Sequence, residues 1–137
     1  MRTILITMVV FLTSSFSFST ADIKDKVKAW ISPPEADNII NPYQRNTFAT
    51  AEGKKIYVQI CFICHGDKGK GDGLGGLALV PRPADLATLK VQGQTDGAIF
   101  WKITEGRPPM ASYKTTYSEI QRWQLVNFLR TFNKIKK

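Results

Sequence analysis

The chain has 137 residues, of which 43% are hydrophobic and 22% charged, a composition typical of one small globular domain. That composition excludes a disordered, collagen-like or multi-span membrane protein. The formal net charge of +8 predicts a partner with an acidic surface, a nucleic acid or an anionic membrane. Only two cysteines and one histidine are present, and all three lie within five consecutive positions.

Residues 1–21 have the composition of a secretory signal peptide. Arg2 precedes an apolar run from Thr3 to Leu12, and small residues follow as far as Ala21. Ten residues span about 15 Å as a helix, half of the ~30 Å hydrocarbon core, so an uncleaved membrane anchor fits less well. We therefore expect cleavage after Ala21 and an exported chain that retains 18 basic and 11 acidic residues, a net charge of +7.

Residues 22–50 are expected to form an extended leader that wraps onto the domain or hangs from it. They contain Pro33, Pro34 and Pro42, which interrupt secondary structure, and they lack a sustained helical or strand period. Residues 51–137 are expected to form the folded domain.

Three segments of this domain are predicted to be helical, with long loops between them. The first runs from residue 51 to 65, where apolar residues recur at spacings of three and four. A short second helix begins at Thr95 or Asp96 and ends at Gly106. The last helix covers about 119–133 and opens with a capping box in which Ser118 pairs with the glutamine three positions on. With no alternating strand of useful length and no internal repeat, the sequence predicts an all-α fold of three to five helices.

The residues Cys61-Phe62-Ile63-Cys64-His65 form a C-x-x-C-H motif, the attachment signature of a c-type haem. Two thiols three positions apart near a helix end are suited to thioether bonds with the two vinyl groups of haem. The adjacent imidazole then lies under the iron as a ligand. We therefore expect one covalently attached haem c, held by Cys61 and Cys64, with His65 as an axial ligand.

Three other uses of the cysteines agree less well with the sequence. A redox-active C-x-x-C needs no histidine and normally follows a strand in a βαβ unit, which the pattern lacks. A structural zinc site needs about four protein ligands, and the chain offers two cysteines and one histidine. A disulfide between cysteines this close constrains almost no chain entropy.

Met110 is the expected second axial ligand. Once residues 1–21 are removed it is the only methionine, and the chain has no second histidine. It follows Pro108 and Pro109, whose fixed φ angles stiffen the backbone. The alternative is a methionine that only fills a gap in the core. Lysine or water could replace it on the iron, but nothing in the sequence points to either.

Signals for nucleotide and nucleic-acid binding are rejected. Gly71, Gly73 and Gly76 match G-x-G-x-x-G, but they follow a predicted helix rather than a strand. The stretch GDKGKGDG lacks the G-K-[ST] ending of a phosphate loop. The basic residues are dispersed along the chain, so no nucleic-acid partner is expected.

From about Ala51 to Phe132 the chain resembles the class I monohaem cytochromes c, particularly those of the bacterial periplasm. The resemblance rests on EGKKIY before CFICHGDKGKGDG, followed by PRPADL, ITEGRPPMASY and the terminal EIQRWQLVNFLRTF. It implies a small cytochrome c fold wrapped around the haem. It also implies that the first and last helices cross near Gly53, Tyr57 and Phe128.

The same resemblance implies roles for individual residues. Cys61 and Cys64 would be the covalent attachment points, with His65 and Met110 as axial ligands. A carbonyl of the PRP segment, that of Pro81 in preference to that of Pro83, would accept a hydrogen bond from His65 Nδ1 and so orient the imidazole.

With both axial positions filled by protein, the iron has no open site for a substrate. We therefore expect a soluble, periplasmic, one-electron carrier rather than an enzyme, without a stable membrane span. Its redox partners would dock through acidic surfaces and include a quinol oxidoreductase, a dehydrogenase, or a terminal oxidase or reductase. One alternative is a haem c subunit of a larger respiratory or dehydrogenase complex. Another is a five-coordinate haem sensor or peroxidase-like protein in which Met110 does not bind iron.

Large apolar side chains are expected to line the haem pocket, although core packing alone would also explain the aromatic ones. The expected residues are Phe62, Leu77, Leu79, Leu86, Trp101, Tyr113 and Trp123.

Overall fold

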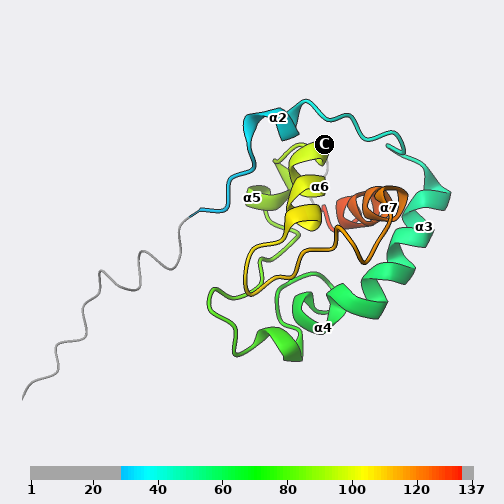
Figure 1. Cartoon of the computed structure of the whole chain (residues 1–137). Helices are drawn as coiled ribbons and strands as arrows, with labels where there is room; N and C mark the ends of the chain where they lie inside the picture. The colour runs from blue at the N-terminus through cyan, green and yellow to red at the C-terminus, as the bar shows by residue number, and fades with distance from the viewer. Residues whose placement is uncertain (1–28, 134–137) are drawn as a thin grey trace, which may run out of the picture.

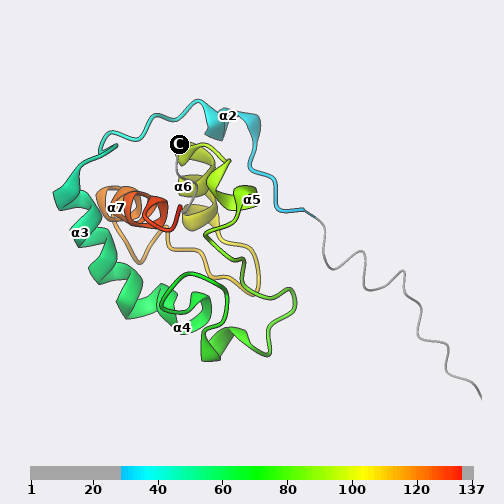
Figure 2. The same cartoon turned by 180° about the vertical axis from the view of Figure 1, so that it is seen from behind.

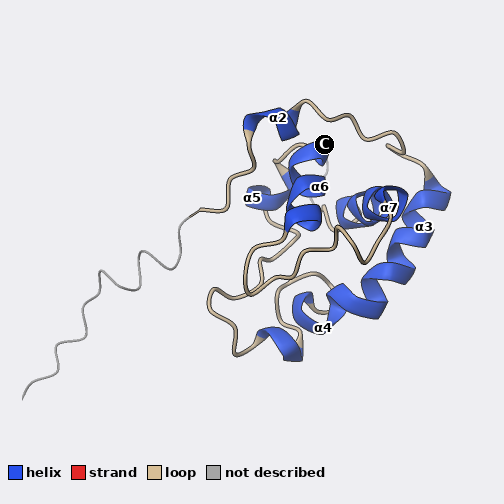
Figure 3. Ribbon diagram, in the orientation of Figure 1, coloured by secondary structure: helices blue, strands red, loops and turns tan. Residues whose placement is uncertain are grey.

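The structure is a computed structural model that describes residues 29–133, and within that range every regular element is a helix (Figures 1 and 3). The α-helices are α2 (Pro34–Asp37), α3 (Thr47–Ile56), α4 (Phe62–His65), α5 (Leu89–Gln92), α6 (Asp96–Glu105) and α7 (Glu119–Arg130), with a π-helical turn at Tyr57–Cys61 and a 3₁₀ turn at Leu74–Gly76. The all-α prediction is therefore confirmed. No helix in this range is long and apolar enough to cross a membrane. The predicted signal peptide, residues 1–21, lies outside the described residues.

The crossing of α3 and α7 forms the main helix pair of the core. Gly53 allows the close approach, because a Cβ atom there would lie only 1.9 Å from the carbonyl oxygen of Gln124 on α7. Next to this contact the rings of Tyr57 and Phe128 pack with their centroids 5.1 Å apart. The crossing therefore lies where the family resemblance placed it. Leu125 and Val126 of α7 are fully buried in the core behind it.

Helix α3 begins four residues earlier than predicted. Asn46 is its N-cap, and the side chain of Asn46 accepts a hydrogen bond from the backbone N–H of Ala49 at 2.9 Å. The first turn, residues 47–50, combines two threonines with an exposed Phe48, so it does not extend the apolar period that predicts the rest of the helix. From α3 the chain continues through the π-helical turn into α4, which ends at Gly66 with a φ angle of +75°.

Of the two arrangements predicted for the leader, its described part adopts the one that wraps onto the domain, but it contains a helix where an extended segment was predicted. Pro33 and Pro34 start α2 rather than interrupt it, because proline is well suited to the first turn of a helix. Ala36 of α2 is buried, and its carbonyl oxygen lies against Gly97 of α6, where a Cβ atom would approach to 2.0 Å. Seen in Figures 1 and 2, the segment runs from α2 past the ends of α6 and α7 to the start of α3.

Asn41 fastens this segment to two helices. Its side-chain nitrogen donates to Asp96 Oδ2 of α6 at 2.7 Å and to Asn127 Oδ1 of α7 at 2.8 Å. Asn127 in turn donates to the backbone carbonyl of Tyr43. Residues 29–46 are therefore part of the folded unit, although the predicted domain boundary excluded them.

Helices α6 and α7 agree closely with the predictions. Thr95 caps α6, Gly106 ends it, and the predicted capping box of Ser118 opens α7. Helix α7 ends at Arg130, three residues before the predicted end.

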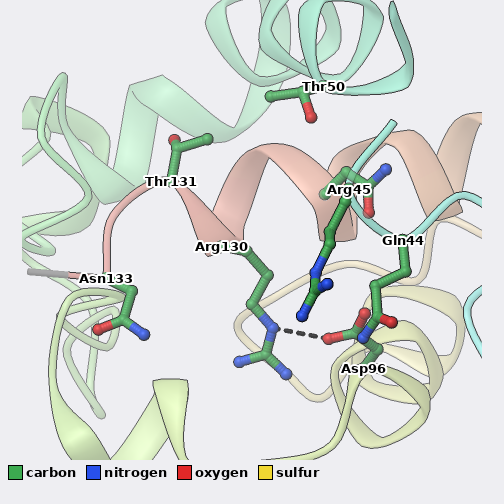
Figure 4. Close-up of a pocket in the computed structure, with 8 residues that line it drawn as sticks. Gln44, Arg45, Thr50, Asp96, Arg130, Thr131 and Asn133 are labelled. Carbon is green, nitrogen blue, oxygen red and sulfur yellow. Dashed lines mark hydrogen bonds and ion pairs between the residues drawn. The ribbon is translucent and has the colours of Figure 1, made fainter. Parts of the chain in front are cut away.

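The side chain of Arg130 joins α7 to α6 and to the segment before it. Its Nε donates to Asp96 Oδ1 at 2.7 Å, and its terminal nitrogens donate to the carbonyls of Gln92 and Gln94. The ion pair lies in an open pocket of about 430 Å³, into which Arg45 also points (Figure 4). The ion pair between Arg130 and Asp96 therefore joins α7 to α6 at this pocket.

Candidate functional site

A cavity of about 730 Å³ lies between the end of α3, α4, the loop of residues 79–88, α6 and the loop that follows α6. All four predicted ligand residues, Cys61, Cys64, His65 and Met110, line this cavity. Residues up to 49 positions apart in the sequence therefore face one space. Its volume is in the range of cofactor pockets, roughly 300–1,000 Å³.

The two cysteines lie at the junction of the π-helical turn with α4. Both are half-buried free thiols, so the disulfide alternative is not formed. Burial, and to a smaller extent the neighbouring Cys64, raises the pKa of Cys61 to about 12. A redox-active cysteine needs the opposite shift, because its thiolate is the reactive form. Within residues 29–133 no group of three or more His, Cys, Asp or Glu side chains is placed to hold a metal ion, so the zinc alternative has no site there.

His65 lies at the C-terminal end of α4, and its Nδ1 is 3.2 Å from the carbonyl oxygen of Ala84. Burial lowers the pKa of His65, although the bond to Ala84 opposes this shift. The imidazole is therefore neutral at neutral pH. With the Nδ1 proton held by the carbonyl, Nε2 keeps the lone pair that a metal ligand requires.

The prediction that Pro81, or else Pro83, supplies the acceptor was wrong, because the acceptor is the carbonyl of Ala84. The carbonyl of Pro83 instead faces Gly71, where a Cβ atom would lie 2.2 Å from the oxygen. The backbone N–H of Leu86 donates to the carbonyl of Gly69 at 2.6 Å. These two contacts position residues 83–86 against the loop that follows α4. The carbonyl of Ala84, which lies in this segment, is thereby brought to His65.

Met110 lies in a tight loop that is anchored to α6. Arg107 and Met110 exchange backbone hydrogen bonds of 3.0 and 2.8 Å across the two prolines. After Met110 the chain turns back onto α6, because the Ser112 hydroxyl donates to the carbonyl of Thr104 at 2.6 Å and the Tyr113 N–H donates to the carbonyl of Ile103 at 3.1 Å. The loop therefore presents Met110 to the cavity from a fixed base.

Only part of the predicted pocket lining is confirmed. Leu79, Leu86 and Tyr113 line the cavity, but Phe62, Leu77, Trp101 and Trp123 do not. Trp123 stacks on Phe100 in the core, with centroids 4.0 Å apart, and Phe62 and Leu77 are each 44% exposed. Trp30, in the leader, was missed although it lines the cavity. No signal in the sequence could have found it, because Trp30 belongs to no periodic pattern.

The residues present fit a covalently attached haem. Two free thiols, a neutral imidazole and a thioether meet at one cavity, which is otherwise lined largely by aliphatic and proline side chains. Nitrogen and sulfur donors of these types are the axial ligands of c-type haems, and the thiols are the groups that form thioether bonds.

A sequence profile described as cytochrome c oxidase, cbb3-type, subunit III, matches residues 48–129. The chain belongs to this cytochrome c family. This cytochrome c domain therefore carries covalently bound haem c and works by haem-based electron transfer. The match begins one residue after the start of α3 and includes the C-x-x-C-H motif and the Met110 loop.

Two solved structures are similar to this cytochrome c domain. The KustC0563 c-type cytochrome is 33% identical, with a TM-score of 0.52, over 60% of this chain and 98% of its own. A chain of the Kuenenia stuttgartiensis reducing HAO-like protein complex, Kustc0457/Kustc0458, is 25% identical, with a TM-score of 0.61, over 70% of this chain. The present chain spans about half the length of that neighbour, covering 50% of it. A search of curated proteins gave no match.

Proposed function

We propose that this protein is a soluble, exported electron carrier of the bacterial periplasm. In this proposal Cys61 and Cys64 hold the haem through thioether bonds, and His65 and Met110 are its axial ligands. The observation that carries the proposal is the single cavity that all four side chains line. When bound, the haem supplies an Fe(III)/Fe(II) couple that accepts and releases one electron.

The protein's own groups favour electron transfer over substrate chemistry. Ala84 fixes the tautomer of His65, and the anchored loop holds Met110, so the two side chains that would bind the iron are already held in place by the protein. A thioether ligand and an apolar pocket both favour the reduced state and raise the reduction potential. A five-coordinate sensor or peroxidase would need one of these ligands to leave the iron.

The surface next to the motif suits brief contacts with redox partners. Phe62, within the attachment motif but off the cavity wall, is 44% exposed, and Val80, between two residues that line the cavity, is 72% exposed, so both offer a small apolar contact area. The positive net charge adds attraction to acidic partners over a longer range. Together these features support transient docking to oxidases, reductases, dehydrogenases or quinol oxidoreductases.

A second candidate function is that of a haem c subunit in a larger oxidoreductase complex. One specific observation favours it, since a structural neighbour is a chain of a reducing HAO-like protein complex. Purification from the native source distinguishes the two. A carrier elutes alone at high salt, whereas a subunit remains with a larger protein whatever the salt concentration.

Haem staining of a denaturing gel tests attachment, because only covalent haem survives denaturation. The full chain, produced with haem-maturation machinery, is expected to stain. The double variant Cys61→Ser/Cys64→Ser is expected to lose the stain. An unstained band of intact parent protein would contradict the proposal.

A further inference from the structure

Trp30 lies on the wall of the haem cavity, close to two cationic side chains. Its ring centroid is 5.1 Å from the guanidinium carbon of Arg107 and 5.8 Å from Lys102 Nζ. Both distances are in the range of cation–π contacts. Trp30 comes from the segment before residue 48 and so lies outside the residues that the family profile matches, whereas Lys102 and Arg107 lie within them.

The wall of the cavity carries more cationic than anionic side chains. Arg82, Lys90, Lys102 and Arg107 line the cavity, and Asp85 is the only carboxylate on its wall within the described residues. The Asp85 carboxylate already accepts the backbone N–H of Ala87 at 2.8 Å. The cations of this wall therefore outnumber its carboxylates.

The positive charges of Lys102 and Arg107 repel one another. Burial, and next the charge of Arg107, lowers the pKa of Lys102, while Asp37 partly offsets the shift. Lys102 donates to the side-chain oxygen of Gln94, which leaves other protons on its ammonium group. Two like charges that share one indole on a cavity wall are stabilised when an anion binds between them.

We propose that Lys102 and Arg107, covered by the indole of Trp30, bind the carboxylates of the haem propionate side chains. The inference rests on the proposed function, because it takes the haem as the occupant of the cavity. Haem carries its two propionates on the edge opposite the vinyl groups that cysteines bind. In agreement, the cations come from α6 and the loop after it, whereas the cysteines come from the junction with α4, below α6 in Figure 1.

The fold holds the indole over this site. Gly97 of α6 gives the carbonyl of Ala36 room to approach, and the Thr95 hydroxyl donates to Asp37 Oδ1 at 2.7 Å. Both contacts fasten α2, which begins four residues after Trp30, to the first turn of α6. The indole can therefore exclude water from the cations and strengthen their interaction with carboxylates.

The test uses the haem-loaded full chain and two readouts, the resonance Raman bending mode of the propionates and the midpoint potential. Lys102→Gln is expected to shift the mode and to lower the potential, because losing a nearby positive charge favours the ferric state. Lys102→Arg keeps the charge and is expected to preserve both readouts. Lys54→Gln removes the same charge from an exposed position of α3 and is expected to change neither.

Trp30→Ala is expected to shift the propionate mode as water enters, whereas Trp101→Ala, off the cavity wall, is expected to leave it in place. An unchanged mode in Trp30→Ala would overturn the role of the indole. An unchanged mode in both Lys102→Gln and Arg107→Gln would overturn the carboxylate site. Failure of the proposed function itself is distinguishable, because the parent protein would then lack haem stain on a denaturing gel.

Discussion

Gly53→Ala tests the helix crossing on which the haem domain is built. A Cβ atom at this position would lie 1.9 Å from the carbonyl oxygen of Gln124, whereas ordinary contacts begin at 3.4 Å, so α7 must retreat by about 1.5 Å. Overpacking of this kind costs about 1–3 kcal/mol, and a clash with backbone belongs at the upper end. The better helix propensity of alanine returns about 1 kcal/mol. The net loss is about 2 kcal/mol, a fall in melting temperature of roughly 8–16 °C for a domain of this size.

Thermal unfolding of the haem-loaded protein, followed by far-UV circular dichroism, measures this loss. Ala51→Gly is the matched control, because Ala51 is exposed on the same helix and the change costs only helix propensity, about 1 kcal/mol. Gly53→Ala should therefore be the less stable variant, although it improves the helix locally. A melting temperature equal to or above that of the parent would refute the close crossing.

Three further predictions concern the loops and the leader. Arg122→Met should lower the free energy of unfolding by about 1–3 kcal/mol, because Arg122 Nη1 donates to the carbonyls of Lys114 and Tyr117 at 2.8 and 2.9 Å. Equilibrium denaturation measures this loss, and an unchanged denaturation midpoint would argue against it. Asn41→Ala should cost about 1–3 kcal/mol by the same assay, since it removes two bonds that tie the leader to α6 and α7. Burial raises the pKa of Tyr113 from 10.0 to about 12, so the folded state keeps a proton that the unfolded state loses. The contribution of Tyr113 to stability should therefore be complete below pH 10 and decline towards pH 12. In a pH titration of the folded protein, the phenolate absorbance of Tyr113 should appear only near pH 12.

The parts of the fold that follow from local chemistry were predictable. The cap of Thr95, the end of α6 at Gly106 and the capping box of Ser118 depend on residues within one turn of the helix end. The C-x-x-C-H motif is equally local, because His65 directly follows Cys64.

Features that depend on contacts between distant segments were not predictable. Nothing near Pro81 shows that the carbonyl of Ala84 lies at His65, since contacts of Gly69 and Gly71 with the second loop decide this. Likewise, the pocket lining could not be separated from the core by residue type. Trp123 stacks inside the core, whereas Trp30, in a segment without periodicity, reaches the cavity.

The central claim is that Met110 and His65 together complete the coordination of a covalently held haem. The most direct measurement is the optical spectrum of the oxidised protein in the red, where a bond from methionine sulfur to ferric iron gives a charge-transfer band. The band is expected in the parent protein and absent in Met110→Ala, with the haem still covalently attached in both. An oxidised parent protein without this band would contradict the claim.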